Sequence, residues 1–260
     1  MLGWLRRRRH ATPIPDALWT PVIARHGFLA SRPAHEQVAL RTLAAEFLAR
    51  KQFTGAHGLQ ITDALAVAVA AQAVLPVLHL GLGWYDDFVG IVIHPADAVA
   101  RRVRTDEAGV VHHYDEVLAG EAMDGGPVML SWQAVNDAAE TAAQGYNVVV
   151  HEFIHKIDMR DGAPDGCPPL PAGFMGHSSA ARARGSWLEV MHAEWDRFRE
   201  QVTIAQRFGG QWPWLDAYAA EAIEEFFAVT GEAYFVNRPR FAEEFPALMP
   251  FFNAFFEPGA

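Results

Sequence analysis

Apolar side chains recur at intervals of three and four residues over several long stretches of the chain. This spacing is the period of an α-helix that buries one face. The clearest case is segment 180–208, whose apolar positions include Trp187, Met191 and Phe198 and which Gly209-Gly210 ends. Further helices are expected over 17–25, 35–51, 63–76, 134–143, 215–235 and 241–256. The pattern therefore predicts a mainly helical protein.

Three short stretches rich in β-branched and aromatic residues predict a small β-sheet. They span 88–93, 110–117 and 127–132, and the turn residues Gly125-Gly126 precede the third. Segment 161–176 is rich in glycine and proline, so we expect a loop there that can wall a cleft. Together with the helices, these strands place the protein in the α+β class.

No internal repeat or linker divides the chain, and 260 residues fit one large domain. We therefore expect a single domain over 16–260. Residues 1–15, which include Arg6 to Arg9, are expected to form a flexible basic tail. No apolar core of a signal peptide follows these arginines.

Composition and charge limit the classes of function. With 51% hydrophobic residues the chain can bury a substantial core, and its net charge of −10 argues against a nucleic-acid partner bound through phosphates. The single cysteine, Cys167, excludes an intrachain disulfide and fits a reducing, cytoplasmic compartment. The most apolar run, 64–78, is too short to span a bilayer, so no stable membrane association is expected.

The segment that begins after Gly145 contains His151-Glu152-Phe153-Ile154-His155, which matches the pattern H-E-x-x-H. Residues four apart lie on one face of a helix, so two imidazoles can bind one metal ion. A catalytic zinc keeps one position open for water, and a glutamate in second place can take the proton of that water. Two structural histidines beside a surface glutamate are the alternative.

The motif supplies two ligands, whereas a catalytic zinc takes three from the protein. The longer pattern H-E-x-x-H-x-x-G-x-x-H is not followed, because Asp158 and Asp161 occupy its later positions. Asp158 is instead a candidate for orienting a ligand histidine, although a surface aspartate is an equal alternative. The best source of a third ligand is the predicted helix 215–235. Its candidates on one helical stripe are Glu221, Glu225 and Glu232, among which periodicity does not choose, and a solvated acidic face is the alternative.

Beyond periodicity, the chain resembles the Mlc titration factor A family of bacterial zinc metallopeptidases over most of its length. The similar segments are LPVL at 75–78, LGLGW at 80–84, PVMLSW at 127–132, NVVVHEFIHKID at 147–158, YAA at 218–220 and EFFAV at 225–229. Two distant motifs in the family's order are far more specific than H-E-x-x-H alone. The resemblance implies a mainly helical, zincin-like metallopeptidase fold with a small β-sheet and H-E-x-x-H on its active-site helix.

The resemblance also implies roles for individual residues. It makes His151 and His155 ligands of one Zn²⁺, with Glu225 as the third ligand and Glu152 as the general base. Tyr218 matches the family's tyrosine seven residues before the ligand glutamate, and we expect its hydroxyl to bind the developing oxyanion. The chain departs from the family at two positions that flank the ligand, Ile223 where proline is common and Glu224 directly before it.

The expected function is thus that of a zinc peptidase of peptide or protein substrates, for which the family suggests an aminopeptidase. The family name adds a partner, the transcription repressor Mlc of sugar uptake, or an analogue of it. A non-catalytic protein that only sequesters such a repressor is the alternative from another class. A purely structural zinc site is disfavoured, because a closed site has no use for Glu152. Segment 127–132 is expected to offer an edge strand to an extended peptide.

Overall fold

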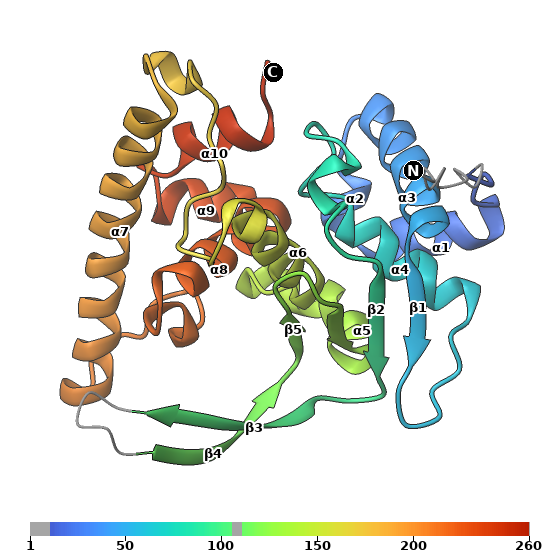
Figure 1. The fold of residues 1–260 in the computed structure, drawn as a ribbon, viewed down its shortest axis with the longest axis horizontal. Coiled ribbons are helices and arrows are strands. Elements are labelled where there is room, and N and C mark those ends of the chain that lie inside the picture. Colours follow the sequence, from blue (N-terminus) through green and yellow to red (C-terminus); the bar gives the residue numbers. More distant parts are fainter. Residues whose placement is uncertain (1–10, 106–110, 260) are drawn as a thin grey trace, which may run out of the picture.

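The computed structural model describes residues 11–105 and 111–259, with the side chains of 98–118 left out of the description. The helices are α1 Asp16–Arg25, α2 Gly27–Ala30, α3 Ala34–Arg50, α4 Asp63–Ala73, α5 Trp132–Thr141, α6 Val148–Asp158, α7 Ala180–Phe208, α8 Ile223–Val236, α9 Arg238–Glu244 and α10 Met249–Phe256. The strands are β1 Gln52–Gly55, β2 Gly90–His94, β3 Ala98–Thr105, β4 Val111–Leu118, β5 Gly120–Ala122 and β6 Val128–Ser131. The predicted mainly helical α+β class is confirmed (Figure 1).

The four-stranded sheet has the order β1-β2-β6-β5. Strands β1, β2 and β6 run parallel, and β5 pairs antiparallel with β6. Segment 127–132 therefore forms an interior strand, so our expectation that it offers a free edge was wrong. The edge beside it belongs to β5, a three-residue strand with no β-branched residue, which the sequence pattern did not indicate.

Strands β3 and β4 form a separate antiparallel ribbon. In Figure 1 this ribbon runs along the lower edge of the molecule towards α7 and leads directly into β5. The predicted strand 110–117 corresponds to β4. Residue 110 of that prediction lies outside the described part of the chain. The partner strand β3 was not predicted. Of the expected tail, 1–15, residues 1–10 lie outside the described part of the chain. Ile14 is buried, and its carbonyl oxygen accepts a hydrogen bond from Arg41.

Helix starts follow local capping chemistry. The side chains of Thr62, Ser131, Asn147 and Ser179 each accept a hydrogen bond from a backbone N–H in the first turn of the helix that follows. The bounds predicted for α7 are confirmed, because Gly209 adopts the left-handed conformation, with φ at 70°, that ends a helix.

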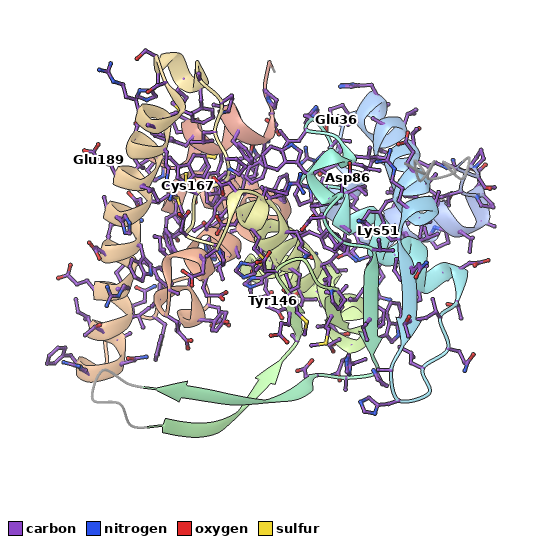
Figure 2. The ribbon with its side chains drawn as sticks, viewed as in Figure 1. Glu36, Lys51, Asp86, Tyr146, Cys167 and Glu189 are labelled. Atoms are coloured by element: carbon purple, nitrogen blue, oxygen red, sulfur yellow. The ribbon has the colours of Figure 1, made fainter. Side chains whose placement is uncertain are left out.

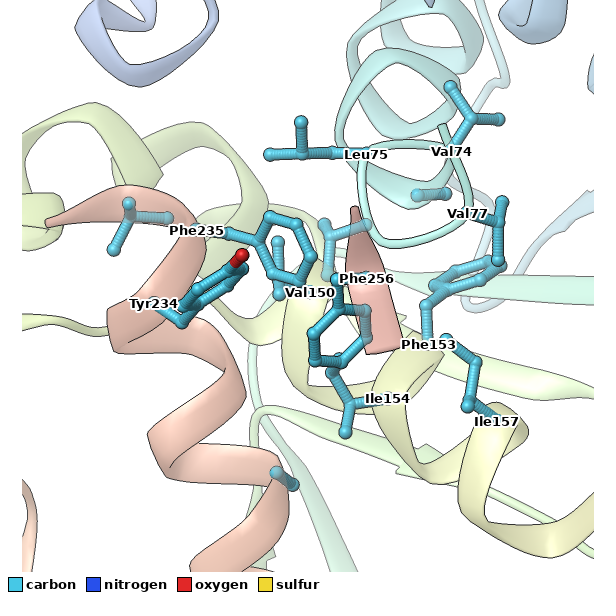
Figure 3. Packing of buried hydrophobic residues seen from close by; sticks show 14 of the residues in the cluster. Val74, Leu75, Val77, Val150, Phe153, Ile154, Ile157, Tyr234, Phe235 and Phe256 are labelled. Atoms are coloured by element: carbon cyan, nitrogen blue, oxygen red, sulfur yellow. The ribbon is translucent and has the colours of Figure 1, made fainter. Parts of the chain in front are cut away.

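Helix α6 lies in the middle of the molecule between the N-terminal helices and the C-terminal helices (Figure 1). Its predicted apolar stripe is fully buried: Val150, Phe153, Ile154 and Ile157 have no exposed surface. Figure 3 shows these side chains in one packed cluster with Leu75 and Val77, which follow α4, and with Phe235 and Phe256 of the C-terminal helices. Burial of this stripe fixes the rotation of α6 about its axis, and this rotation decides where the histidines point.

The described part of the chain contains no helix long and apolar enough to cross a bilayer. The apolar run 64–78 forms most of α4, in which seven of eleven residues are buried, together with the turn that follows it.

Candidate metal centre

His151 and His155 lie one turn apart on α6, and their Nε2 atoms are 3.1 Å from each other. The Glu225 Oε2 atom, from the first turn of α8, lies 3.2 Å from each of those two nitrogens. These three residues form the one group of potential metal ligands found among the described residues. The structure therefore brings together the ligand set that the resemblance implied, from two helices 70 residues apart in sequence.

The spacing of the three atoms fits a bound cation. Zinc with bonds of about 2.0 Å in tetrahedral geometry holds its ligand atoms about 3.3 Å apart. The Nδ1 atom of His151 donates to the carboxylate of Glu232 at 2.7 Å, which leaves the lone pair of its Nε2 facing the carboxylate of Glu225 in the neutral ring. Two acceptors in that position repel each other unless a proton or a metal ion lies between them.

The electrostatics of the centre favour positive charge. Burial lowers the pKa of His151, but Glu232 and Glu225 outweigh this effect and hold the pKa well above its ordinary value. Burial raises the pKa of Glu225, yet the two imidazoles outweigh it and leave that pKa well below its ordinary value. A metal ion would supply the same positive charge without a proton.

Glu232 has a role that the sequence reasoning did not assign. It is fully buried two helical turns after Glu225, and it accepts hydrogen bonds from the ring of His151 and from the backbone N–H of Asn147. It thus orients His151 from behind and fixes the ring tautomer. The stripe that offered Glu232 as a possible third ligand was the only sequence signal for it.

Asp158, our candidate for orienting a ligand, forms its hydrogen bonds elsewhere. Its carboxylate accepts from the backbone N–H groups of Gly166 and Cys167. The Nδ1 atom of His155 is buried and has no hydrogen-bond partner among the described residues. The two ligand histidines are therefore supported unequally.

Replacing Glu232 with glutamine should weaken metal binding by about 10- to 100-fold, because His151 loses the carboxylate that orients it. Titration with a competing chelator measures this affinity. Glu189→Gln, which changes an exposed glutamate on α7 (Figure 2), is the matched control and should bind metal as the wild type does. Equal affinity in both variants would contradict the role of Glu232.

Glu152 faces the same cleft as the cluster. It is 4% exposed, and burial raises its pKa to about 7, the range that suits a general base. The backbone of β5 passes directly over it: a Cβ added at Gly120 would lie 2.4 Å from Oε1 of Glu152. Only glycine allows this close approach of the edge strand.

Tyr218 lies near the cluster, although not for the reason we expected. Its ring centre is 6.3 Å from that of His151. It belongs to a separate 3₁₀ turn, Ala217–Ala220, and the extended backbone of Ala222 separates this turn from α8. The predicted continuous helix 215–235 is therefore wrong, and so is the two-turn spacing between Tyr218 and Glu225. The side chain of Asp216 starts the 3₁₀ turn by accepting from the N–H of Tyr218.

A cavity of about 400 Å³ opens over the cluster. One wall is formed by residues 119–122, and the others include Tyr146 before α6 (Figure 2), Pro164 and Tyr218. Glu224, the neighbour of the expected third ligand, lines the cavity but is absent from the ligand group. Glu221 is exposed, does not line this cavity and is also absent from the ligand group. Glu225 is thus the carboxylate of this segment that contacts both histidines.

Comparison with known proteins places the chain among metallopeptidases. A family model described as "Glucose-regulated metallo-peptidase M90" matches residues 2–257. Mlc titration factor A of Edwardsiella ictaluri is 33% identical over 245 residues, covering 94% of this chain and 86% of that protein. Mlc titration factor A of Salmonella arizonae is 32% identical over 257 residues, covering 98% and 96%. The similarity therefore extends over nearly the full length of both proteins.

Proposed function

Because the chain belongs to the M90 family of glucose-regulated metallopeptidases, we propose that it is a zinc-dependent peptidase. His151, His155 and Glu225 would hold one Zn²⁺. The observation that carries the proposal is the convergence of their ligand atoms to 3.1–3.2 Å at the floor of a cavity that Glu152 also lines. We further propose that residues 16–260 form one zincin-like domain.

When bound, the metal would polarise the scissile carbonyl and acidify the attacking water. Glu152 would accept the proton of that water and deliver it to the leaving amine. Tyr218 would donate a hydrogen bond to the oxygen on which negative charge develops. The outer side of β5, which β6 does not occupy, would pair with the backbone of an extended substrate.

We also propose that the substrate carries a free amino terminus. Glu121, Asp216 and Glu224 line the cavity together with the metal cluster, and their carboxylates would attract a protonated α-amino group. Cleavage of a peptide library with free and acetylated amino termini, with and without chelator, tests both the metal dependence and the need for a free amino terminus. Chelator-sensitive cleavage of the free peptides alone is the expected result, while equal cleavage of acetylated peptides would exclude the aminopeptidase mode.

The close passage of β5 over Glu152 gives a specific prediction. Gly120→Ala should lower kcat/KM by about 100-fold, because the added methyl group displaces the base by a substantial part of an ångström or more. Steady-state kinetics measures the effect. Gly185→Ala is the control, since a Cβ there meets nothing within 4 Å. Unchanged kinetics in Gly120→Ala would show that Glu152 does not act from this position.

The names of the relatives suggest a second candidate function, binding of a transcription repressor such as Mlc, which would place the protein in the cytoplasm. With a net charge of −10, such binding would involve the repressor rather than its DNA. Pull-down of purified Mlc with wild type and with Glu225→Ala separates the two functions. Retained binding without metal supports sequestration independent of catalysis, and no binding by either protein excludes this partner.

A further inference from the structure

Two charged residues that follow the second histidine are buried, yet neither contacts the metal cluster. Lys156 is completely buried and Asp158 is 1% exposed. They lie two residues apart on α6, so their side chains leave the helix about 200° apart, on opposite sides. Burying charge is costly unless the group is paired or hydrogen-bonded, so the partners of each residue indicate its purpose.

The partners of Lys156 are backbone carbonyls of the β5–β6 hairpin. Its Nζ donates to the carbonyl oxygens of Met123 at 2.6 Å and of Gly126 at 3.1 Å. Asp87 lies 3.7 Å away, and the ring of Phe88 completes the surroundings at 4.6 Å. The ammonium group therefore ties the turn of the hairpin to α6. One helical turn earlier on the same side of α6, β5 passes over Glu152.

The partners of Asp158 are backbone N–H groups of the opposite wall. Its two oxygens accept from Gly166 at 2.9 Å and from Cys167 at 3.0 Å. Gly166 has a φ of +75°, and a Cβ there would lie 2.9 Å from the carbonyl oxygen of Ile223, two residues before Glu225. The same loop brings Pro164 to the cavity. Asp158 therefore ties this loop to α6 and against the start of α8.

We propose that Lys156 and Asp158 are positioning residues that fix the two walls of the cleft relative to the metal cluster. Lys156 holds the β5–β6 hairpin, and Asp158 holds the loop 161–176. The consequence for substrate binding rests on the proposed peptidase function, whereas the attachment of the walls does not. The helix that would bind the metal thus also sets the width of the groove that would bind the peptide.

The accessibility of the Cys167 thiol measures whether Asp158 holds the loop 161–176 in place. Cys167 is the only cysteine in the chain, its thiol is fully buried on the inner side of α7 (Figure 2), and its N–H donates to Asp158 at 3.0 Å and to Asp165 at 3.2 Å. Burial raises the pKa of the thiol to about 12, which keeps it protonated and unreactive. A thiol reagent therefore labels Cys167 only when the loop opens.

The test compares Lys156→Met and Asp158→Asn with the wild type. Asp158→Asn should increase the rate of Cys167 labelling by Ellman's reagent at least about tenfold, because an amide cannot accept both N–H bonds. Lys156→Met should leave labelling unchanged but speed hydrogen exchange of the amides in 120–130, which Asp158→Asn should not alter. Glu189→Gln, which changes an exposed side chain on α7, is the control and should not affect labelling.

Both variants should keep one metal ion per chain and should raise KM more than they lower kcat, because the walls bind substrate while the base and ligands remain in place. Wild-type rates of labelling and exchange in both variants would overturn the proposal, as would equal labelling in Glu189→Gln and Asp158→Asn. Lys156→Gln and Asp158→Ser serve as second variants if the first do not fold. If the wild type cleaves no peptide, the proposed function fails, but labelling and exchange still decide whether the walls are held in this way.

Discussion

Glu152→Gln should lower kcat by about 100- to 10,000-fold, the range that a positioned general base contributes. The amide has the shape of the carboxylate but cannot accept the proton of the attacking water. The variant should fold, because the carboxylate is buried against β5 with a pKa raised to about 7 and its charge does not stabilise the folded state. Metal binding should persist, since Glu152 is not part of the ligand group.

The measurement combines kcat at saturating peptide with metal content of the same preparation. Loss of turnover at full metal occupancy assigns the base to Glu152. Turnover equal to that of the wild type would remove Glu152 from the mechanism. Loss of both turnover and metal would show that it supports the ligands instead.

Glu225→Ala should reduce metal affinity more strongly than the loss of a residue that only orients a ligand, which costs about 10- to 100-fold. Its carboxylate oxygen lies 3.2 Å from both imidazole nitrogens, and its removal leaves two ligands where a catalytic zinc requires three. The imidazoles also lose the neighbour that balances their charge, so the pKa of His151 should fall towards its ordinary value.

Glu224→Ala and Glu221→Ala are the matched controls for this variant. Glu224 lines the cavity without joining the ligand group, and Glu221 is exposed outside it. Both variants should retain the full metal content by elemental analysis. Loss of metal in either control, with metal kept in Glu225→Ala, would reverse the assignment of the third ligand.

The centre of this fold could be predicted because local and global signals agree there. Along α6 the apolar stripe, the capping Asn147 and the spacing of the histidines all require the same helix in the same rotation. The long helix α7 was predictable for the same reason, since its period is strong and a glycine stops it. These features depend only on residues within about two turns of one another.

What the sequence pattern missed depends on contacts between distant segments. Strand β5 exists because β6 pairs with it, and its three residues carry no β-signal of their own. The residues before α8 are good helix formers, so periodicity continues through them, yet the extended Ala222 breaks the helix. The position of Tyr218 followed from that break and could not be calculated from helical spacing.

The third ligand shows the same limit at the site itself. Periodicity placed Glu221, Glu225 and Glu232 on one stripe, and the resemblance selected Glu225. In the structure Glu232 lies behind His151 and Glu225 in front of it, a distinction that depends on how α8 packs against α6. A spacing of seven residues therefore identified both carboxylates that contact His151 but not their separate positions.

The central claim is that His151, His155 and Glu225 hold one zinc ion, and metal analysis of the purified protein tests it most directly. Mass spectrometry of the native, metal-loaded protein should show one zinc per chain, and the same measurement on a His155→Ala variant should show none. A wild-type protein that binds no zinc, or a variant that keeps it, would contradict the account.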